Sequence, residues 1–87
     1  MLYGKEELGP RVMTVETSEN YRIIVKFNNG ERKLFDMNQL LDMPAYQKLP
    51  EVFTLARVEF GTVVWPGNID VSPDTLYLQG TSIEGSE

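Results

Sequence analysis

The stretch YRIIVKFNNGERKLFD, residues 21–36, decides the fold of this chain. Apolar and polar side chains alternate on both sides of Asn29-Gly30, and a period of two is typical of β-strands. Asn-Gly readily accepts the positive φ angles of a two-residue type I′ turn. The pattern therefore predicts two antiparallel strands, residues 21–28 and 31–36, joined by a tight hairpin turn.

A two-residue turn fixes the register of this predicted hairpin. It places Val25 opposite Leu34 and Ile24 opposite Phe35, and these two pairs point to opposite faces. Both faces of the hairpin would then carry apolar side chains. We expect helices to cover one face, and a loop or a second subunit to cover the other.

Further strand signals flank the hairpin. Residues 11–17 alternate and predict a strand that precedes it. After the hairpin, residues 52–60 and 63–65 predict two more strands, which turn at Gly61-Thr62. Short connections of this kind join antiparallel neighbours, so we expect all five strands to pair in this way.

Two short helices are also predicted. Asp36 is a good N-cap, and Gln39 stands three residues further on, as in a capping box. Pro44 ends this first helix or breaks it before a second turn. Ser72-Pro73-Asp74 combines an N-cap, a proline at the first helical position and a carboxylate near the positive end of the helix dipole. It predicts a helix over residues 73–79.

The order of these elements predicts an α+β domain. We expect one antiparallel sheet of about five strands, made of a three-stranded meander and a β-hairpin, with both short helices on one of its faces. The domain is expected to span residues 10–80. A flexible arm, residues 1–9, would precede it, and a frayed tail, residues 81–87, would follow it.

The composition limits the chemistry that the chain can perform. Its 87 residues include no cysteine and no histidine. Their absence excludes disulfides, thiolate catalysis and zinc–thiolate sites, and it removes the commonest general base. We therefore expect no enzyme activity, no cofactor and no metal. The sequence contains no membrane-spanning stretch and no signal-peptide pattern, so we expect a cytoplasmic protein that does not bind membranes.

The net charge of −5 comes from residues 37–87, which carry two basic and seven acidic side chains, whereas residues 1–36 carry six of each. Acidic surfaces repel phosphate backbones, so we expect no direct nucleic-acid binding by this chain alone. A basic protein partner would suit the acidic half, although a solvated surface without a partner is the simpler explanation. The candidate acidic contacts are Asp42, Glu51, Glu59, Asp70 and Asp74.

Five side chains are candidates for partner binding: Tyr46, Trp65, Asp70, Asp74 and Tyr77. Aromatic residues beside loops often form interaction hot spots, but Trp65 also suits the centre of a small core, and we favour the core. Asp36, Asp70 and Asp74 could form a metal or acid–base cluster. Helix capping and hydrogen bonds within loops explain these three carboxylates more simply.

The most specific motif is TVVWPGNIDVSPDTLY, residues 62–77. With VKFNNGE at residues 25–31 and FDM at residues 35–37, it resembles a small bacterial family of unknown function, DUF2442. The usual family form is W-P-N-G-x-D, then P-E or P-D, then L-Y. Here the Asn-Gly order is reversed to Gly67-Asn68. The resemblance covers most of the chain.

The resemblance implies a protein partner rather than a catalysed reaction, because the family has no established catalytic residues. Its members stand alone or precede a helix-turn-helix domain. They are often encoded beside another small protein, in what looks like a toxin–antitoxin pair. For this chain the resemblance implies an antitoxin-like or adaptor module without the DNA-binding domain, with a protein partner encoded nearby and a homodimer possible. The alternative is a small ligand- or metal-binding domain, or an enzyme that uses carboxylates.

Overall fold

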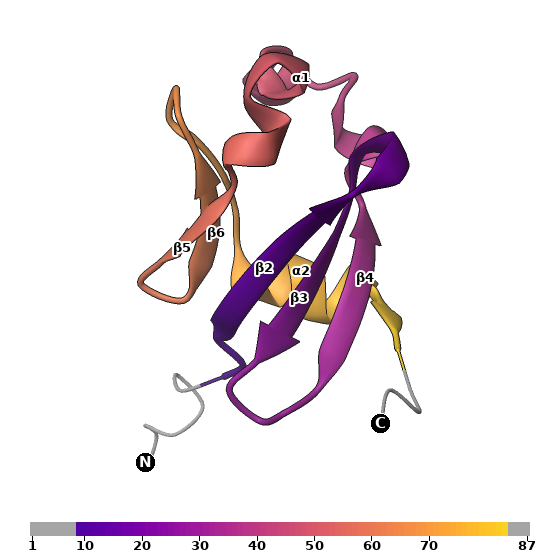
Figure 1. The fold of residues 1–87 in the computed structure, drawn as a ribbon, viewed down its shortest axis with the longest axis vertical. Helices are drawn as coiled ribbons and strands as arrows, with labels where there is room; N and C mark the ends of the chain where they lie inside the picture. The colour runs from indigo at the N-terminus through magenta and orange to yellow at the C-terminus, as the bar shows by residue number, and fades with distance from the viewer. Residues whose placement is uncertain (1–8, 84–87) are drawn as a thin grey trace.

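The structure, a computed structural model, describes residues 9–83 and arranges them as two antiparallel sheets and several short helices (Figure 1). The predicted α+β class is confirmed. The expectation of a single sheet of about five strands is wrong. One sheet has four strands in the order β2-β3-β4-β8, and the other has three in the order β5-β6-β7.

All the elements are short. The four-stranded sheet consists of β2 (Val12–Ser18), β3 (Arg22–Phe27), β4 (Arg32–Asp36) and β8 (Thr81–Ser82). The three-stranded sheet consists of β5 (Arg57–Glu59), β6 (Thr62–Trp65) and β7 (Ile69–Val71). The α-helices are α1 (Leu49–Val52) and α2 (Pro73–Gln79), and the 3₁₀ helices are η2 (Glu19–Tyr21), η3 (Met37–Leu40), η4 (Pro44–Tyr46) and η5 (Phe53–Leu55).

Two sheets form because the predicted strand over residues 52–60 is helical in its first half. Pro50 lies in the first turn of α1, where its fixed φ favours a helix. Leu49 and Phe53 are four residues apart and both are buried, which is helical spacing rather than strand spacing. Only residues 57–59 remain extended, and they begin a separate sheet.

The predicted hairpin forms with a register that differs by one residue. Val25 lies opposite Lys33, and Ile24 lies opposite Leu34. Because side chains alternate between faces, this shift moves every residue of β4 to the other side. Phe35 is therefore buried in the core, and Leu34 lies on the outer face beside Ile24.

The hairpin turn explains the shift, because its loop has three residues rather than two. Phe27 N donates to Glu31 O at 2.8 Å, and Gly30 N donates to Phe27 O at 2.9 Å. Only Gly30 takes a positive φ, of 90°, as expected for a type I turn that ends in a left-handed residue. The Asn29 side chain accepts a hydrogen bond from Glu31 N at 2.9 Å, which stabilises this alternative turn.

A single core lies between the sheets and the helices. In β3 the alternation is as predicted, since Ile23, Val25 and Phe27 are all buried. Helix α2 packs behind the four-stranded sheet (Figure 1), where the rings of Phe27 and Tyr77 make an edge contact at 5.1 Å between centroids. The core residues are Val12, Ile23, Val25, Phe27, Phe35, Met37, Leu49, Phe53, Val63, Trp65, Ile69, Val71 and Leu76.

The predicted helix starts are confirmed by their caps. The Asp36 carboxylate accepts from Asn38 N at 2.9 Å at the start of η3. Ser72 Oγ accepts from Thr75 N at 3.2 Å at the start of α2. The first helix is a 3₁₀ helix, and Gln39 donates its side-chain amide to the Asp36 carbonyl rather than completing a capping box.

The end of the described chain is paired, which differs from the frayed tail expected from residue 81 onward. Thr81 lies opposite Leu34 and Ser82 opposite Lys33 in the short strand β8. Residues 84–87 of the expected tail, and residues 1–8 of the expected arm, lie outside the described residues. In the part of the chain that is described, no helix is long and apolar enough to cross a membrane.

Candidate interaction surface on the three-stranded sheet

Trp65 lies in the core, which is the alternative that the sequence favours. Its side chain is 3 % exposed, and indole Nε1 donates to the Phe53 carbonyl at 2.9 Å. The Trp65 and Phe53 rings stack at 6.5 Å between centroids, with 19° between their planes. The ring therefore joins the three-stranded sheet to η5 and offers almost no surface to a partner.

Tyr46 and Asp70 are brought together, as two candidates from distant parts of the sequence. The Tyr46 hydroxyl donates to the backbone carbonyl of Asp70 at 2.8 Å. Burial raises the pKa of Tyr46 above its ordinary value of 10.0, and the negative charge of Asp70 raises it further. The bond fastens η4 to β7 and leaves the Asp70 carboxylate exposed on the outer face of the sheet.

Tyr77 and Asp74 lie on α2, and the Tyr77 side chain contacts the four-stranded sheet. The Tyr77 hydroxyl donates to the Glu31 carboxylate at 3.0 Å, and Lys33 Nζ lies 4.8 Å from the centre of its ring. Asp74 is exposed in the first turn of α2. Within residues 9–83, no three histidine, cysteine or acidic side chains come close enough to hold a metal, so Asp36, Asp70 and Asp74 do not form the cluster considered above.

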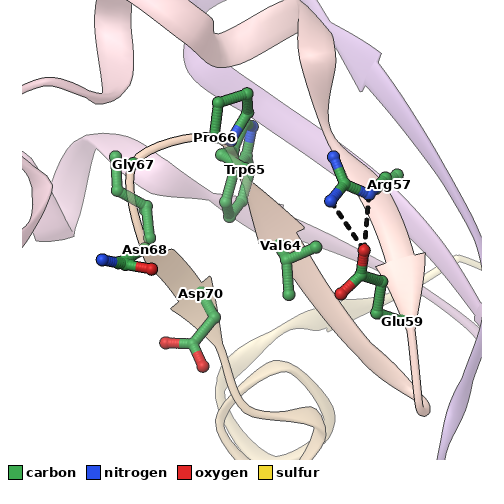
Figure 2. A pocket seen from close by; sticks show the side chains of 9 residues that line it. Arg57, Glu59, Val64, Trp65, Pro66, Gly67, Asn68 and Asp70 are labelled. Atoms are coloured by element: carbon green, nitrogen blue, oxygen red, sulfur yellow. Dashed lines mark hydrogen bonds and ion pairs between the residues drawn. The ribbon is translucent and has the colours of Figure 1, made fainter.

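The outer face of the three-stranded sheet carries charged side chains on either side of Val64 (Figure 2). Arg57 lies opposite Val64, which lies opposite Asp70. Arg57 also forms an ion pair with Glu59 at 2.6 Å, and both side chains are well exposed. This face and the Pro66–Asn68 loop line an open groove. Exposed ion pairs contribute little to stability, so we consider these side chains as a binding surface rather than as a source of stability.

The Pro66–Asn68 loop explains how this chain accommodates the reversed motif order. Gly67 and Asn68 both have positive φ, of 92° and 65°. Glycine and asparagine are the two residues that adopt this left-handed region most easily. Either order of the pair therefore suits the backbone, and the turn between β6 and β7 is retained.

The predicted strand over residues 52–60 does not extend to Phe60. This residue lies in the two-residue turn between β5 and β6, where Glu59 pairs with Thr62. Phe60 and Gly61 have φ of 53° and 79°, the combination that a type I′ turn requires. The Phe60 side chain is 90 % exposed. The sequence signal was Gly61, because a glycine before a strand often marks the second position of such a turn.

A bulky residue at positive φ is a conformational outlier. Tyr21 is another, with φ of 60°, but its ring packs edge-on against Phe53 at 5.2 Å between centroids. That packing offsets the cost of the Tyr21 backbone. The exposed Phe60 ring has no comparable compensation within the described chain.

Arg11 holds the Phe60 turn in place. Its guanidinium donates to the Phe60 carbonyl, and Val12 N donates to Gly61 O at 3.0 Å. Gly61 packs so closely against the Arg11 side chain that a Cβ atom would lie 2.7 Å from Nε. The turn is thereby tied to the start of β2, and the Phe60 ring is presented from a supported position.

A protein-family model described as "Protein of unknown function (DUF2442)" matches residues 12–82 of this chain. The chain belongs to the DUF2442 family. The matched region of this DUF2442 protein includes both sheets and α2, together with Phe60 and the Pro66–Asn68 loop. No curated protein and no solved structure matches the chain.

Proposed function

We propose that this DUF2442 chain is a non-catalytic protein–protein interaction module, of the antitoxin-like or adaptor type. The observation that carries the proposal is Phe60, a 90 % exposed aromatic side chain on a backbone with φ of 53°. Exposure of the ring and the left-handed backbone both cost free energy in the isolated chain. Such outliers cluster at functional sites, and burial of the ring in a partner would recover the first cost.

The charge of the chain supports a basic partner. Asp70 lies on the outer face of the three-stranded sheet and forms no ion pair within residues 9–83, whereas Glu59, next to Phe60 in sequence, is paired with Arg57. Both belong to residues 37–87, which carry the whole net charge of −5. We propose a partner with an apolar pocket for the Phe60 ring and basic side chains that face Asp70. The charges would speed association and set specificity, while the ring would supply affinity.

The antitoxin-like role rests on the resemblance set out above, which favours a small protein encoded beside this one. A direct test is to copurify the chain with that neighbouring gene product. Phe60→Ala should remain folded and weaken binding by at least about tenfold, as removal of a hot-spot aromatic does.

Leu78→Ala is the matched control, because Leu78 is also an exposed apolar residue, at 78 %, but lies on α2. It should bind the partner as the unaltered chain does. Unchanged binding by Phe60→Ala, or equal losses in both variants, would contradict the proposed surface.

A further inference from the structure

The four-stranded sheet has two unlike faces. The core and α2 cover one face, and among residues 9–83 no element crosses the other (Figure 1). On this bare face, Ile24 lies opposite Leu34, and Lys26 lies opposite Arg32. Glu16 of β2 lies on the same face, opposite Ile24. We call Ile24, Lys26, Arg32 and Leu34 the basic sheet face.

Lys26 and Arg32 are an unfavourable pair for the isolated chain. Like charges placed directly opposite each other on neighbouring strands are destabilising. Neither forms an ion pair within residues 9–83, where Arg57–Glu59 is the only one. The two positive charges are therefore adjacent and have no carboxylate partner in the described chain.

The other end of the same face is balanced. Arg22 lies opposite Asp36, and its positive charge helps to lower the pKa of that carboxyl below 3.8, after the larger contribution of hydrogen bonds from Asn38. The two adjacent cations thus lie in the row beside the β3–β4 turn, and the carboxylate of Glu16 lies one row away on β2. The neighbouring row, Ile24 and Leu34, is apolar and only half-buried.

We propose that the basic sheet face binds an acidic segment of a partner protein. A carboxylate can pair with both Lys26 and Arg32, and the planar guanidinium of Arg32 can hold it through two hydrogen bonds. An apolar side chain of the same segment would lie on Ile24 and Leu34. The like-charge pair would then be neutralised in the complex.

Two other occupants fit less well. A nucleic acid owes most of its affinity to many phosphate contacts, and the basic sheet face offers only two adjacent cations, Lys26 and Arg32. A second copy could offer its acidic half, but the basic sheet face and the acidic half are different surfaces. Contacts between them would be head-to-tail, and such contacts form open chains unless the rotation happens to close a ring.

The basic sheet face is separate from the Phe60 surface, because it belongs to the other sheet. One chain could therefore bind an acidic and a basic protein segment at once, as an adaptor does. The inference does not depend on the Phe60 proposal, and different variants test the two.

The test uses the full chain and a random copolymer of glutamate and tyrosine as the acidic probe, with binding measured by calorimetry at about 0.05 M salt, where screening is weak. Lys26→Glu should weaken binding by about tenfold and should also raise the urea midpoint of unfolding, because it places opposite charges across from each other. Lys26→Gln should weaken binding less than Lys26→Glu does, and its urea midpoint should lie between those of the unaltered chain and Lys26→Glu.

Lys48→Glu is the matched control, since it makes the same change of charge at an exposed lysine next to α1. It should leave both binding and the urea midpoint close to those of the unaltered chain. A gain in stability together with a loss of binding, confined to residue 26, is a result that a purely structural lysine would not produce.

Several results would overturn the inference. One is a failure of the unaltered chain to bind the copolymer, and another is an equal loss with Lys48→Glu, which would mean that binding follows net charge alone. Tighter binding of a single-stranded oligonucleotide at the same salt would assign the face to nucleic acid. Self-association of the chain that Lys26→Glu abolishes would assign it to a second copy.

Discussion

At the scale of single residues, Phe60 and Tyr21 have nearly the same φ, of 53° and 60°, but different surroundings. The Tyr21 ring packs against Phe53, so its conformation is supported by the core. The Phe60 ring projects into solvent. Replacement of Phe60 should therefore affect stability and partner binding differently.

Phe60→Asn should therefore stabilise the chain by about 1 kcal/mol, because asparagine adopts the left-handed region at much lower cost than phenylalanine. Urea unfolding monitored by Trp65 fluorescence measures the change. Phe60→Ala removes the ring but leaves the backbone cost, so it is the control and should gain less. A Phe60→Asn variant that unfolds at lower urea than the unaltered chain would contradict this account of the turn.

At the scale of elements, the sequence predicts those turns and caps that depend only on residues close together in the chain. The hairpin of β3 and β4 and the cap of α2 at Ser72 both follow from short sequence patterns. The register of the hairpin did not, because a two-residue and a three-residue loop differ only in whether Asn28 belongs to the strand. Asn29 contributes to that choice through a side-chain hydrogen bond that no hydrophobic pattern contains.

Other elements were missed for reasons of length. β7 and β8 have three and two residues, which is too short for a period of two to be recognised. Residues 49–55 were ambiguous, because a short apolar run fits a buried strand as well as a helix. The candidate residues could also be predicted only in part. The sequence identifies aromatic and acidic residues near loops, but only the structure separates the buried Trp65 from the exposed Phe60.

The turn between β6 and β7 gives an element-scale prediction. The double variant Gly67→Asn with Asn68→Gly restores the usual family order and should change stability by less than about 1 kcal/mol, since both residues tolerate positive φ. Asn68→Val should cost about 1–2 kcal/mol, because a β-branched residue resists φ of 65°. Thermal melts of the two variants make the comparison, and equal destabilisation would contradict it.

The cap of η3 gives a prediction about pH. Hydrogen bonds from the backbone and side chain of Asn38, together with the Arg22 charge, lower the pKa of Asp36 from its ordinary value of 3.8. The folded state thus binds this proton less readily than the unfolded state does. The contribution of Asp36 is complete above pH 3.8 and is lost as pH falls through its lower folded pKa.

Urea midpoints measured at pH 5 and at pH 2 should therefore fall less for Asp36→Asn than for the unaltered chain. Asparagine is also a good N-cap, so the variant keeps the hydrogen bond without the titration. Asp42→Asn is the control, as its carboxylate is exposed beyond the end of η3. An equal fall in the Asp36→Asn and unaltered chains would contradict the assignment.

At the scale of the whole molecule, charge is unevenly distributed, because β2, β3 and β4 are net positive and residues 37–87 are net negative. Four basic and two acidic side chains lie in β2, β3 and β4, whereas residues 37–87 hold the entire net charge of −5. The proposed Phe60 partner is basic. Its association rate should therefore fall as salt rises from about 0.05 to about 0.5 M, because the Debye length shortens roughly threefold.

Reversal of Asp70 to lysine should slow this association without lowering the melting temperature, because its carboxylate is exposed and forms no ion pair within residues 9–83. Stopped-flow mixing with the copurified partner measures the rate. Reversal of Lys26 to glutamate is the control, as it should leave this association unchanged or make it slightly faster. A rate that does not depend on salt would contradict the electrostatic part of the proposal.

The four-stranded sheet brings both ends of the described chain to the same side of the molecule. Asn28 N donates to Arg11 O at 2.9 Å, and Ile83 N donates to Arg32 O at 3.0 Å, so residues 11 and 83 flank the β3–β4 loop on opposite edges of the sheet. Three strand spacings separate those edges, about 14 Å. A linker of a few residues could therefore close the chain into a ring, and a cut at Gly67 would open it again elsewhere. Because the two ends lie close together, the fold suits circular permutation, and it also suits insertion into a loop of a host protein through both ends.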